Sequence, residues 1–243
     1  MKIHIRRAFC SSSDTYDSSC DIQRIVADHL AEKLPDVNGD VLEIGTGTGI
    51  FTEHLNKKYS DVNIYCIDIA HSLLKKAQKT YSKNIYICGD GERLPFNRGF
   101  SLVAGSSCLQ WFQNPEKSIP AMLAGSERFA FSVFVDGTFA EMKILNEMTG
   151  FGSVYPLPKQ DDLLKCFDGF SIEHEVREYV IYLGSVQEFL KKQKGTGATF
   201  SGGGRHASKT AYKRFLELYP ELFGDGGRIP VTYRILYITG FTS

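Results

Sequence analysis

The sequence predicts an α/β fold in which helices cover both faces of a doubly wound, mostly parallel sheet. Apolar runs of strand length alternate with amphipathic segments through residues 41–135, and this order of elements builds such a sheet. The first run is almost entirely apolar, as expected for a strand that is buried on both faces. It ends directly in three alternating glycines, so the sequence places a tight turn at its carboxyl end.

The composition argues against several classes of protein. The chain has 243 residues, with 28 Lys+Arg and 28 Asp+Glu, so it lacks the basic excess of a general nucleic-acid binder. It contains no apolar run long enough to span a membrane and no signal-peptide core. The 6 cysteines form no Cys-x-x-Cys pair, and the 6 histidines show no metal-ligand spacing. We expect a cytoplasmic protein with reduced thiols, no metal, and neither nucleic acid nor membrane as a partner.

The first 38 residues precede the first clear strand. Apolar residues along one side of 21–34 predict a helix there. The polar stretch 11–19 is rich in serine and aspartate, which favour turns and caps over regular structure. A flap over a ligand site is one interpretation of this segment.

The stretch 41–51 predicts a strand over Val41–Ile44, a turn through Gly45, Gly47 and Gly49, and a helix over 49–58. Glycines let the backbone approach a ligand closely, and the new helix offers N–H groups to an anion. A nicotinamide fingerprint needs its third glycine where this chain has Ile50, and no Gly-Lys-Ser/Thr of a phosphate loop follows. An ordinary glycine-rich turn is the alternative interpretation.

The second strand is expected over 63–67, and it ends at Asp68. This aspartate follows Gly49 by nineteen residues, close to the distance at which an acidic residue meets the ribose in dinucleotide folds. One carboxylate can accept hydrogen bonds from both neighbouring ribose hydroxyls. The alternative is a capping role for Asp68 in the helix that follows, around 72–77.

The third strand is expected over 84–88, followed by Gly89-Asp90-Gly91. A carboxylate at this position would lie at the same edge of the sheet as Asp68, where ligands bind in open α/β folds, and Asp90 could accept from an adenine amine. Simple turn chemistry is the alternative. Further strands are expected over 101–106 and 129–135.

After residue 135 the pattern changes to a cap of helices around an outer strand. Helices are expected over 141–148, 159–167, 185–194 and 208–218, and strands over 172–183 and 229–238. Because no linker separates these elements from the rest, we expect a single domain. Its parts would be an N-terminal flap with helices (1–38), a cofactor-binding core (39–136), cap insertions (137–228) and a terminal strand (229–243).

Several landmarks together resemble class I methyltransferases that use S-adenosylmethionine: the 43–49 motif, Asp68, Gly89-Asp90 and Leu94-Pro95-Phe96. Ser106-Ser107-Cys108-Leu109-Gln110-Trp111 resembles, more narrowly, the malonyl-acyl-carrier-protein O-methyltransferases of biotin synthesis. The spacing of Phe9, Tyr16 and Gln23, the 194–198 loop and the 230–233 strand also resemble that family. The departures are Ser101, where such proteins usually carry Asp, and the glycines at 202–204.

The resemblance implies a Rossmann-like, seven-stranded sheet with an antiparallel terminal strand and a small helical cap. It also implies methyl transfer from S-adenosylmethionine to the free carboxylate of a malonyl group on acyl carrier protein, or on a coenzyme A thioester. Tyr16 and Gln23 are expected to close over the cofactor and the reacting carboxylate, and Trp111 to wall the substrate pocket; packing roles are the alternatives for Tyr16 and Trp111. The implied cofactor-binding positions are Glu43, Gly45, Thr46, Gly47, Gly49, Asp68, Ile69, Asp90, Gly91 and Ser106.

Seven basic residues lie between 191 and 214 with no acidic residue among them, a local excess in a chain of zero net charge. Acyl carrier proteins are acidic, so such a patch would attract one. The expected contacts of the carrier protein and its prosthetic arm are Lys191, Lys194, Arg205, Lys209, Lys213 and Arg214. A solvated helix face with chance clustering is the alternative.

Two further functions remain open from the sequence. One is methylation of another small molecule on oxygen, nitrogen or carbon, and the other is cofactor binding without catalysis. Nucleic-acid methylation is disfavoured by the zero net charge and by Ser106-Ser107-Cys108, where such enzymes carry an Asn-Pro-Pro-Tyr type of motif.

Overall fold

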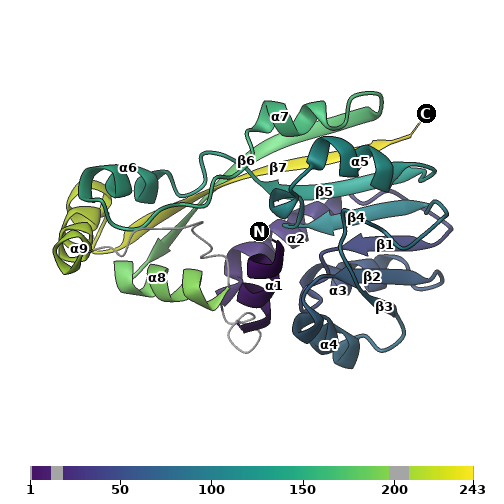
Figure 1. Ribbon diagram of the computed structural model, residues 1–243, viewed down its shortest axis with the longest axis horizontal. Helices are drawn as coiled ribbons and strands as arrows, with labels where there is room; N and C mark the ends of the chain where they lie inside the picture. The colour runs from purple at the N-terminus through teal and green to yellow at the C-terminus, as the bar shows by residue number, and fades with distance from the viewer. Residues whose placement is uncertain (1, 12–18, 197–207, 243) are drawn as a thin grey trace. The chain divides into compact units, whose positions relative to one another are not determined.

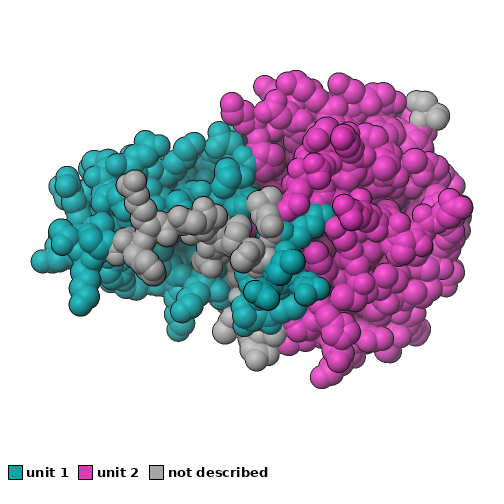
Figure 2. All heavy atoms as spheres, in the orientation of Figure 1, with its two compact units in different colours: residues 1–20, 136–157, 178–234 teal, residues 21–135, 158–177, 235–243 magenta. Residues whose placement is uncertain are grey.

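The computed structural model describes residues 2–11, 19–196 and 208–242. Its internal contacts divide the chain into two compact units, which Figure 2 colours separately. We call them the helical unit (Met1–Cys20, Asp136–Leu157 and Glu178–Arg234) and the sheet unit (Asp21–Val135, Pro158–Arg177 and Ile235–Ser243). The single-domain organisation and its internal boundaries stay predictions.

Strands and helices alternate along the chain as Figure 1 labels them. The strands are β1 (Val41–Ile44), β2 (Ile64–Asp68), β3 (Ile85–Cys88), β4 (Leu102–Ser106), β5 (Arg128–Phe134), β6 (Ser171–Leu183) and β7 (Ile229–Phe241). The helices are α1 (Lys2–Ser11), α2 (Asp21–Glu32), α3 (Ile50–Lys58), α4 (His71–Thr80), the short 3-10 helix η2 (Leu109–Trp111), α5 (Pro115–Leu123), α6 (Ala140–Thr149), α7 (Gln160–Lys165), α8 (Val186–Gly195) and α9 (Lys209–Phe223). Within the described ranges, no helix is both long enough and apolar enough to cross a membrane.

The seven strands form one sheet in the order β3-β2-β1-β4-β5-β7-β6. Neighbours from β3 to β5 are parallel, whereas β7 runs antiparallel to β5. The predicted seven-stranded, mostly parallel sheet with an antiparallel terminal strand is therefore confirmed. The strand order reverses at β1 and β4, and in open sheets this reversal opens a crevice beyond the carboxyl ends of those strands.

Both faces of the parallel strands are covered in the sheet unit. Helices α5 and α7 lie on one face (Figure 1), where they share an apolar core with Phe129 and Phe131 of β5. The ring of Phe167, just after α7, stacks on Phe129 at 5.5 Å between centroids. Helices α2 and α3 pack on each other, α2 contacts β4 and β5, and α4 contacts β2 and β3. Since side chains alternate along a strand, Leu42 faces α5 and α7, while Glu43 points to the opposite face and reaches α3.

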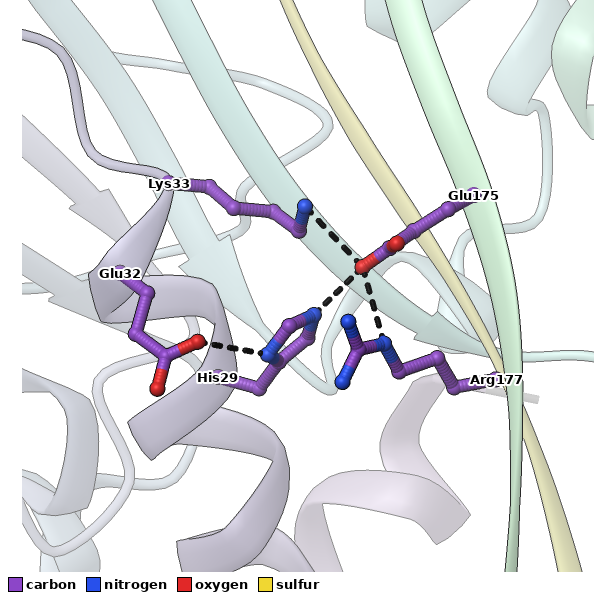
Figure 3. Close-up of polar contacts among 5 residues, drawn as sticks. All are labelled: His29, Glu32, Lys33, Glu175 and Arg177. Atoms are coloured by element: carbon purple, nitrogen blue, oxygen red, sulfur yellow. Dashed lines mark hydrogen bonds and ion pairs between the residues drawn. The ribbon is translucent and has the colours of Figure 1, made fainter.

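A cluster of charged side chains joins α2 to β6 within the sheet unit (Figure 3). His29 is buried and places one ring nitrogen 2.9 Å from Glu32 Oε2 and the other against Glu175 Oε1. The same Glu175 oxygen lies 3.0 Å from Lys33 Nζ and 3.2 Å from Arg177 Nε. These neighbours, above all the hydrogen bond with His29, lower the pKa of Glu175 to about 2. The cluster therefore pins β6 to α2 with a carboxylate held in its ionised form.

The helical unit has an aromatic core of its own. Phe139 lies 5.6 Å from Phe189 and 5.1 Å from Tyr233 between ring centroids. Tyr219 is fully buried, and its hydroxyl donates to the carbonyl of Pro230 at 3.0 Å. A second tie runs from α6 to β7, where the buried Glu141 accepts a hydrogen bond from the Thr232 backbone N–H at 3.2 Å.

Helix α5 was not among the elements predicted from the sequence. Its start is fixed by Glu92, which lies far upstream in the loop after β3. The Glu92 carboxylate accepts from the backbone N–H groups of Gln113 and Asn114, at 3.0 and 2.8 Å, and from the Ser118 hydroxyl at 3.1 Å. These bonds satisfy donors at the helix start that have no partner within the helix. They also tie the loop after β3 to α5.

Candidate functional site

The glycine loop between β1 and α3 has the backbone that its sequence requires. Gly45, Gly47 and Gly49 have φ angles of 73°, 58° and 97°, in the left-handed region that side chains disfavour. At the start of the loop, the N–H groups of Gly45 and Thr46 donate to the carbonyl of Ile67, at 2.9 and 3.3 Å. The loop is thereby attached to the carboxyl end of β2.

Packing gives two of these glycines a second requirement that the sequence does not reveal. A Cβ atom at Gly45 would lie 2.4 Å from Cβ of Cys108, and one at Gly49 would lie 2.8 Å from the Tyr81 ring. Such distances are far inside van der Waals contact. The space beside these glycines is therefore taken by the exit of β4 and by the end of α4, so the loop is clamped from both sides.

Asp68 joins the glycine loop to the turn after β2. Its carboxylate accepts from the N–H of Gly47 at 2.7 Å and from the N–H of Ala70 at 2.7 Å. Burial raises the pKa of Asp68, while these two hydrogen bonds act in the opposite direction. Ala70 is the residue that precedes α4, so the Asp68 carboxylate meets the start of that helix through the Ala70 N–H and is not itself the capping residue.

Glu43 lies beneath the loop and is almost fully buried. Its Oε2 accepts from the Thr52 hydroxyl at 2.7 Å and from the Cys66 thiol at 3.5 Å, so it connects β1 with α3 and β2. Burial is the main cause that raises the pKa of Glu43 to about 7. The predicted role in orienting the loop is compatible with these contacts.

The turn after β3 carries Asp90 and Gly91. The Asp90 side chain accepts from the N–H of Glu92 at 3.0 Å, and its carbonyl accepts from the N–H of Arg93 at 2.9 Å. This is a side-chain-stabilised turn, as the alternative interpretation expected. A Cβ at Gly91 would lie 2.8 Å from Ile44, so the turn packs directly on the end of β1.

The exit of β4 supplies polar groups to the same edge of the sheet. Ser106 Oγ lies 3.0 Å from Ser132 Oγ on β5. Ser107 has a φ of 58°, one of two described non-glycine residues with a positive φ. Its N–H donates to the Ser132 carbonyl at 2.8 Å, and its carbonyl accepts from Gln110 Nε2 at 2.7 Å. Trp111 follows in η2 and is partly buried.

Four buried side-chain atoms near these elements have no hydrogen-bond partner among the described residues: Gln23 Oε1, Thr46 Oγ1, Ser107 Oγ and Gln110 Oε1. An unpaired buried polar atom costs about 1–3 kcal/mol, so each one calls for an explanation. A polar ligand is one such explanation. Ser107 and Gln110 were not among the predicted site residues, and only their place just after β4 could have indicated them.

The remaining predicted residues fall in three places. Gln23 is in the first turn of α2, and Ile69 follows β2 with its side chain partly exposed. Tyr16 and Arg205 lie outside the described residues. The other basic residues are exposed in the helical unit, with Lys191 and Lys194 on α8 and Lys209, Lys213 and Arg214 on α9.

The residues of the sheet unit fit a nucleoside cofactor with a polar, charged end. Strand order brings Asp90, Asp68, the glycine loop and Ser106 to one edge, after β3, β2, β1 and β4 respectively. This edge combines carboxylates for hydroxyl groups, a glycine backbone for close approach, and unpaired buried side-chain atoms. No group of three or more His, Cys, Asp or Glu suited to a metal ion occurs in the part of the chain that the structure describes.

Comparisons with known proteins agree with this geometry. Residues 42–123 match the family described as Methyltransferase domain. Along most of its length the chain is similar to curated malonyl-[acyl-carrier protein] O-methyltransferases. The identity is 26% with the protein of Anoxybacillus flavithermus (96% of this chain, 95% of that one) and 27% with that of Geobacter sulfurreducens (97% of both). The identity is 29% with malonyl-[acyl-carrier protein] O-methyltransferase 2 of Ilyobacter polytropus, over 98% of this chain and 96% of that one.

Solved structures show the same fold. The YcgJ protein of Bacillus subtilis superposes with a TM-score of 0.63 at 14% identity, over 89% of this chain and 97% of that one. A putative methyltransferase in complex with the Trm112 activator of Haloferax volcanii also gives 0.63 at 14% identity, over 98% of both chains. The fold, the match to the methyltransferase domain and the full-length similarity all agree with an S-adenosylmethionine-dependent methyltransferase.

Proposed function

We propose that this methyltransferase esterifies the free carboxylate of a malonyl group carried by acyl carrier protein, in an early step of biotin synthesis. The observation that carries the proposal is similarity over 95–97% of this chain to relatives named for that reaction. The similarity extends beyond the 42–123 domain match to the elements of the helical unit. A malonyl thioester of coenzyme A is a smaller substrate with the same reacting group.

Within this proposal, different loops at the carboxyl edge of the sheet bind different parts of the cofactor. The glycine loop receives the methionine end, Asp68 the ribose hydroxyls and Asp90 the adenine amine, with Glu43 holding the loop from below. A carboxylate has about four acceptor positions, and the N–H groups of Gly47 and Ala70 occupy two of those on Asp68. The carboxylate that fixes the loop can thus also accept from the ribose.

Little proton chemistry is needed for the proposed reaction. S-adenosylmethionine supplies a methyl group on a positively charged sulfur, which leaves as a neutral thioether when a carboxylate oxygen bonds to the methyl carbon. The malonyl carboxylate is already ionised at pH 7, so no general base is required. The chain must align the carboxylate oxygen with the methyl group and exclude water. In this proposal Tyr16, Gln23 and Trp111 perform those tasks.

The exposed basic residues of α8 and α9 are proposed to attract the acidic carrier protein. Such steering acts on the association rate and weakens as salt screens it. We expect the triple variant Lys191→Glu/Lys209→Glu/Arg214→Glu to lower kcat/KM for malonyl-carrier protein at least tenfold at low salt. Activity on malonyl-coenzyme A should change much less. The matched control reverses Lys75, Lys79 and Lys83, which are exposed in the sheet unit; an equal loss in both triple variants would contradict a specific docking surface.

The proposed function is tested directly by incubating purified protein with S-adenosylmethionine and malonyl-carrier protein. Intact-mass spectrometry should show the carrier gain one methyl group, and mild alkaline hydrolysis should remove it, as expected for an ester. Acetyl-carrier protein, which lacks the free carboxylate, is the control and should stay unchanged. Methylation of another small acceptor, with none of malonyl-carrier protein, would refute the proposed substrate.

A cytoplasmic location is part of the same proposal. No disulfide joins any of the six cysteines in the part of the chain that the structure describes. Free thiols are typical of compartments that keep cysteine reduced.

A further inference from the structure

The turn that follows β4 holds Ser107 in an unusual backbone conformation. A serine with a φ of 58° persists only where the surroundings impose it. Here the Ser107 N–H is bonded to the Ser132 carbonyl, and the Ser107 carbonyl is bonded to the side-chain amide of Gln110. The turn is therefore held from both ends, and strained, fixed turns of this kind concentrate at ligand sites.

The same turn contains two buried oxygens without a partner among the described residues, Ser107 Oγ and Gln110 Oε1. The orientation of the Gln110 amide is settled, because its Nε2 donates to a carbonyl oxygen at 2.7 Å. Its Oε1 can then only accept a hydrogen bond, whereas the Ser107 hydroxyl can donate one. The turn thus offers one donor and one acceptor, on residues three apart in the sequence.

The turn adjoins the glycine loop. Cys108, between the two residues, packs so closely on Gly45 that a Cβ there would lie 2.4 Å from the cysteine Cβ. The Cys108 thiol also fills the space beside Gly105. The turn with the two unpaired oxygens thus packs beside the glycine loop, which is proposed to receive the methionine end of the cofactor, at the sheet edge where strand order reverses.

We propose that Ser107 and Gln110 recognise the amino-acid end of S-adenosylmethionine. The Ser107 hydroxyl donates to its carboxylate, and the Gln110 side-chain carbonyl accepts from its ammonium group. A group that carries both charges matches the donor and the acceptor of the turn, whereas the malonyl carboxylate carries acceptors only and would leave Gln110 Oε1 unpaired.

The proposal rests on the use of S-adenosylmethionine and is tested by calorimetric binding. Three ligands are compared: S-adenosylhomocysteine, its analogue without the carboxylate, and its analogue without the amino group. Ser107→Ala should weaken binding of the complete ligand about tenfold, and of the carboxylate-free analogue less than twofold. Gln110→Met should weaken the complete ligand about tenfold and the amino-free analogue less than twofold. A general effect on the fold would weaken all three ligands equally, so the comparison among ligands separates a specific lost contact from such an effect.

Two further variants complete the design. Ser107→Gly also removes the hydroxyl but suits a positive φ, so it should fold at least as well as wild type and show the same carboxylate-specific loss. Ser101→Ala changes a serine just before β4 and should bind all three ligands normally. Equal losses for all three ligands, or no loss, in the Ser107 and Gln110 variants would overturn this proposal while wild type binds normally. Failure of wild type to bind S-adenosylhomocysteine would instead contradict the cofactor use itself.

Discussion

The carboxylates beneath the glycine loop differ from Glu175 in what surrounds them. Glu43 and Asp68 are held by hydroxyl, thiol and backbone N–H groups, with no ion pair to a described residue, and burial raises the pKa of each. Glu175 lies against His29, Lys33 and Arg177, and these neighbours lower its pKa to about 2. Burial disfavours the charged form of Glu43 and Asp68, whereas the neighbours of Glu175 favour its charged form.

This difference separates a binding edge from a structural joint. Carboxylates that are buried without a counter-charge are typical of functional sites, where a ligand supplies the missing partners. A carboxylate surrounded by cations needs no ligand and serves to hold two elements together. Substitutions in the two groups should therefore affect different properties of the protein.

The largest expected effect is on cofactor affinity. Asp68→Ala removes the proposed acceptor for the ribose and the anchor of Gly47, so binding of S-adenosylhomocysteine should fall on the order of 100-fold or more. Isothermal titration calorimetry measures the loss, and circular dichroism should show an intact fold. Asp61→Ala, at an exposed position before β2, is the control. Wild-type affinity in Asp68→Ala would remove Asp68 from the binding edge.

The next effect is on the pH dependence of stability. A folded-state pKa of about 7 for Glu43, against 4.5 in the unfolded chain, means that the folded state binds the extra proton between these values. The free energy of unfolding should thus decrease by about 3 kcal/mol as pH rises from 4.5 to above 7. Glu43→Gln should abolish this decrease in urea unfolding series at pH 5, 6, 7 and 8, while Glu53→Gln, on α3 with its side chain 44% exposed, should retain it. A parallel pH profile for wild type and Glu43→Gln would show that Glu43 does not titrate in this range.

The smallest effect concerns the joint between α2 and β6. Glu175→Gln should lower the free energy of unfolding by about 1 kcal/mol at pH 7, since its side chain is 33% exposed and solvent screens its charges. The contribution of a carboxylate with a lowered pKa is present above pH 4.5 and is lost as pH falls toward 2, so the variant and wild type should converge in acid. Glu32→Gln contacts the same imidazole but is 72% exposed and should be nearly neutral. Glu175→Gln should leave the affinity for the cofactor unchanged. A marked loss of that affinity would contradict a purely structural role for Glu175.

Much of the fold could be predicted because its signals are local. The apolar runs gave β1 to β5 within about two residues at each end, and the resemblance supplied the antiparallel final strand. Helix α5 escaped prediction because Pro120 lies inside it and because its start is capped by Glu92, more than twenty residues earlier. Contacts between segments so distant in sequence leave no local pattern.

The candidate site was predictable in its positions and not in its contacts. The spacing of Gly49 and Asp68 indicated a cofactor edge, but it could not show that Asp68 already bonds Gly47 and Ala70. Likewise, nothing in the sequence distinguishes Ser107 from its neighbour Ser106. Only the fold shows that the hydroxyl of Ser106 meets Ser132 while that of Ser107 has no partner among the described residues.

The hydrogen bonds from the start of α5 to Glu92 should report whether the cofactor site is occupied. Asp90 and Glu92 belong to one short turn, and Glu92 in turn holds the amide hydrogens of Gln113 and Asn114. A ligand that steadies Asp90 will also steady Glu92, so those two amides should exchange with deuterium more slowly when the cofactor is bound. Adenine capture would thus be visible as a change in isotope uptake at the start of α5, at groups that the ligand does not touch.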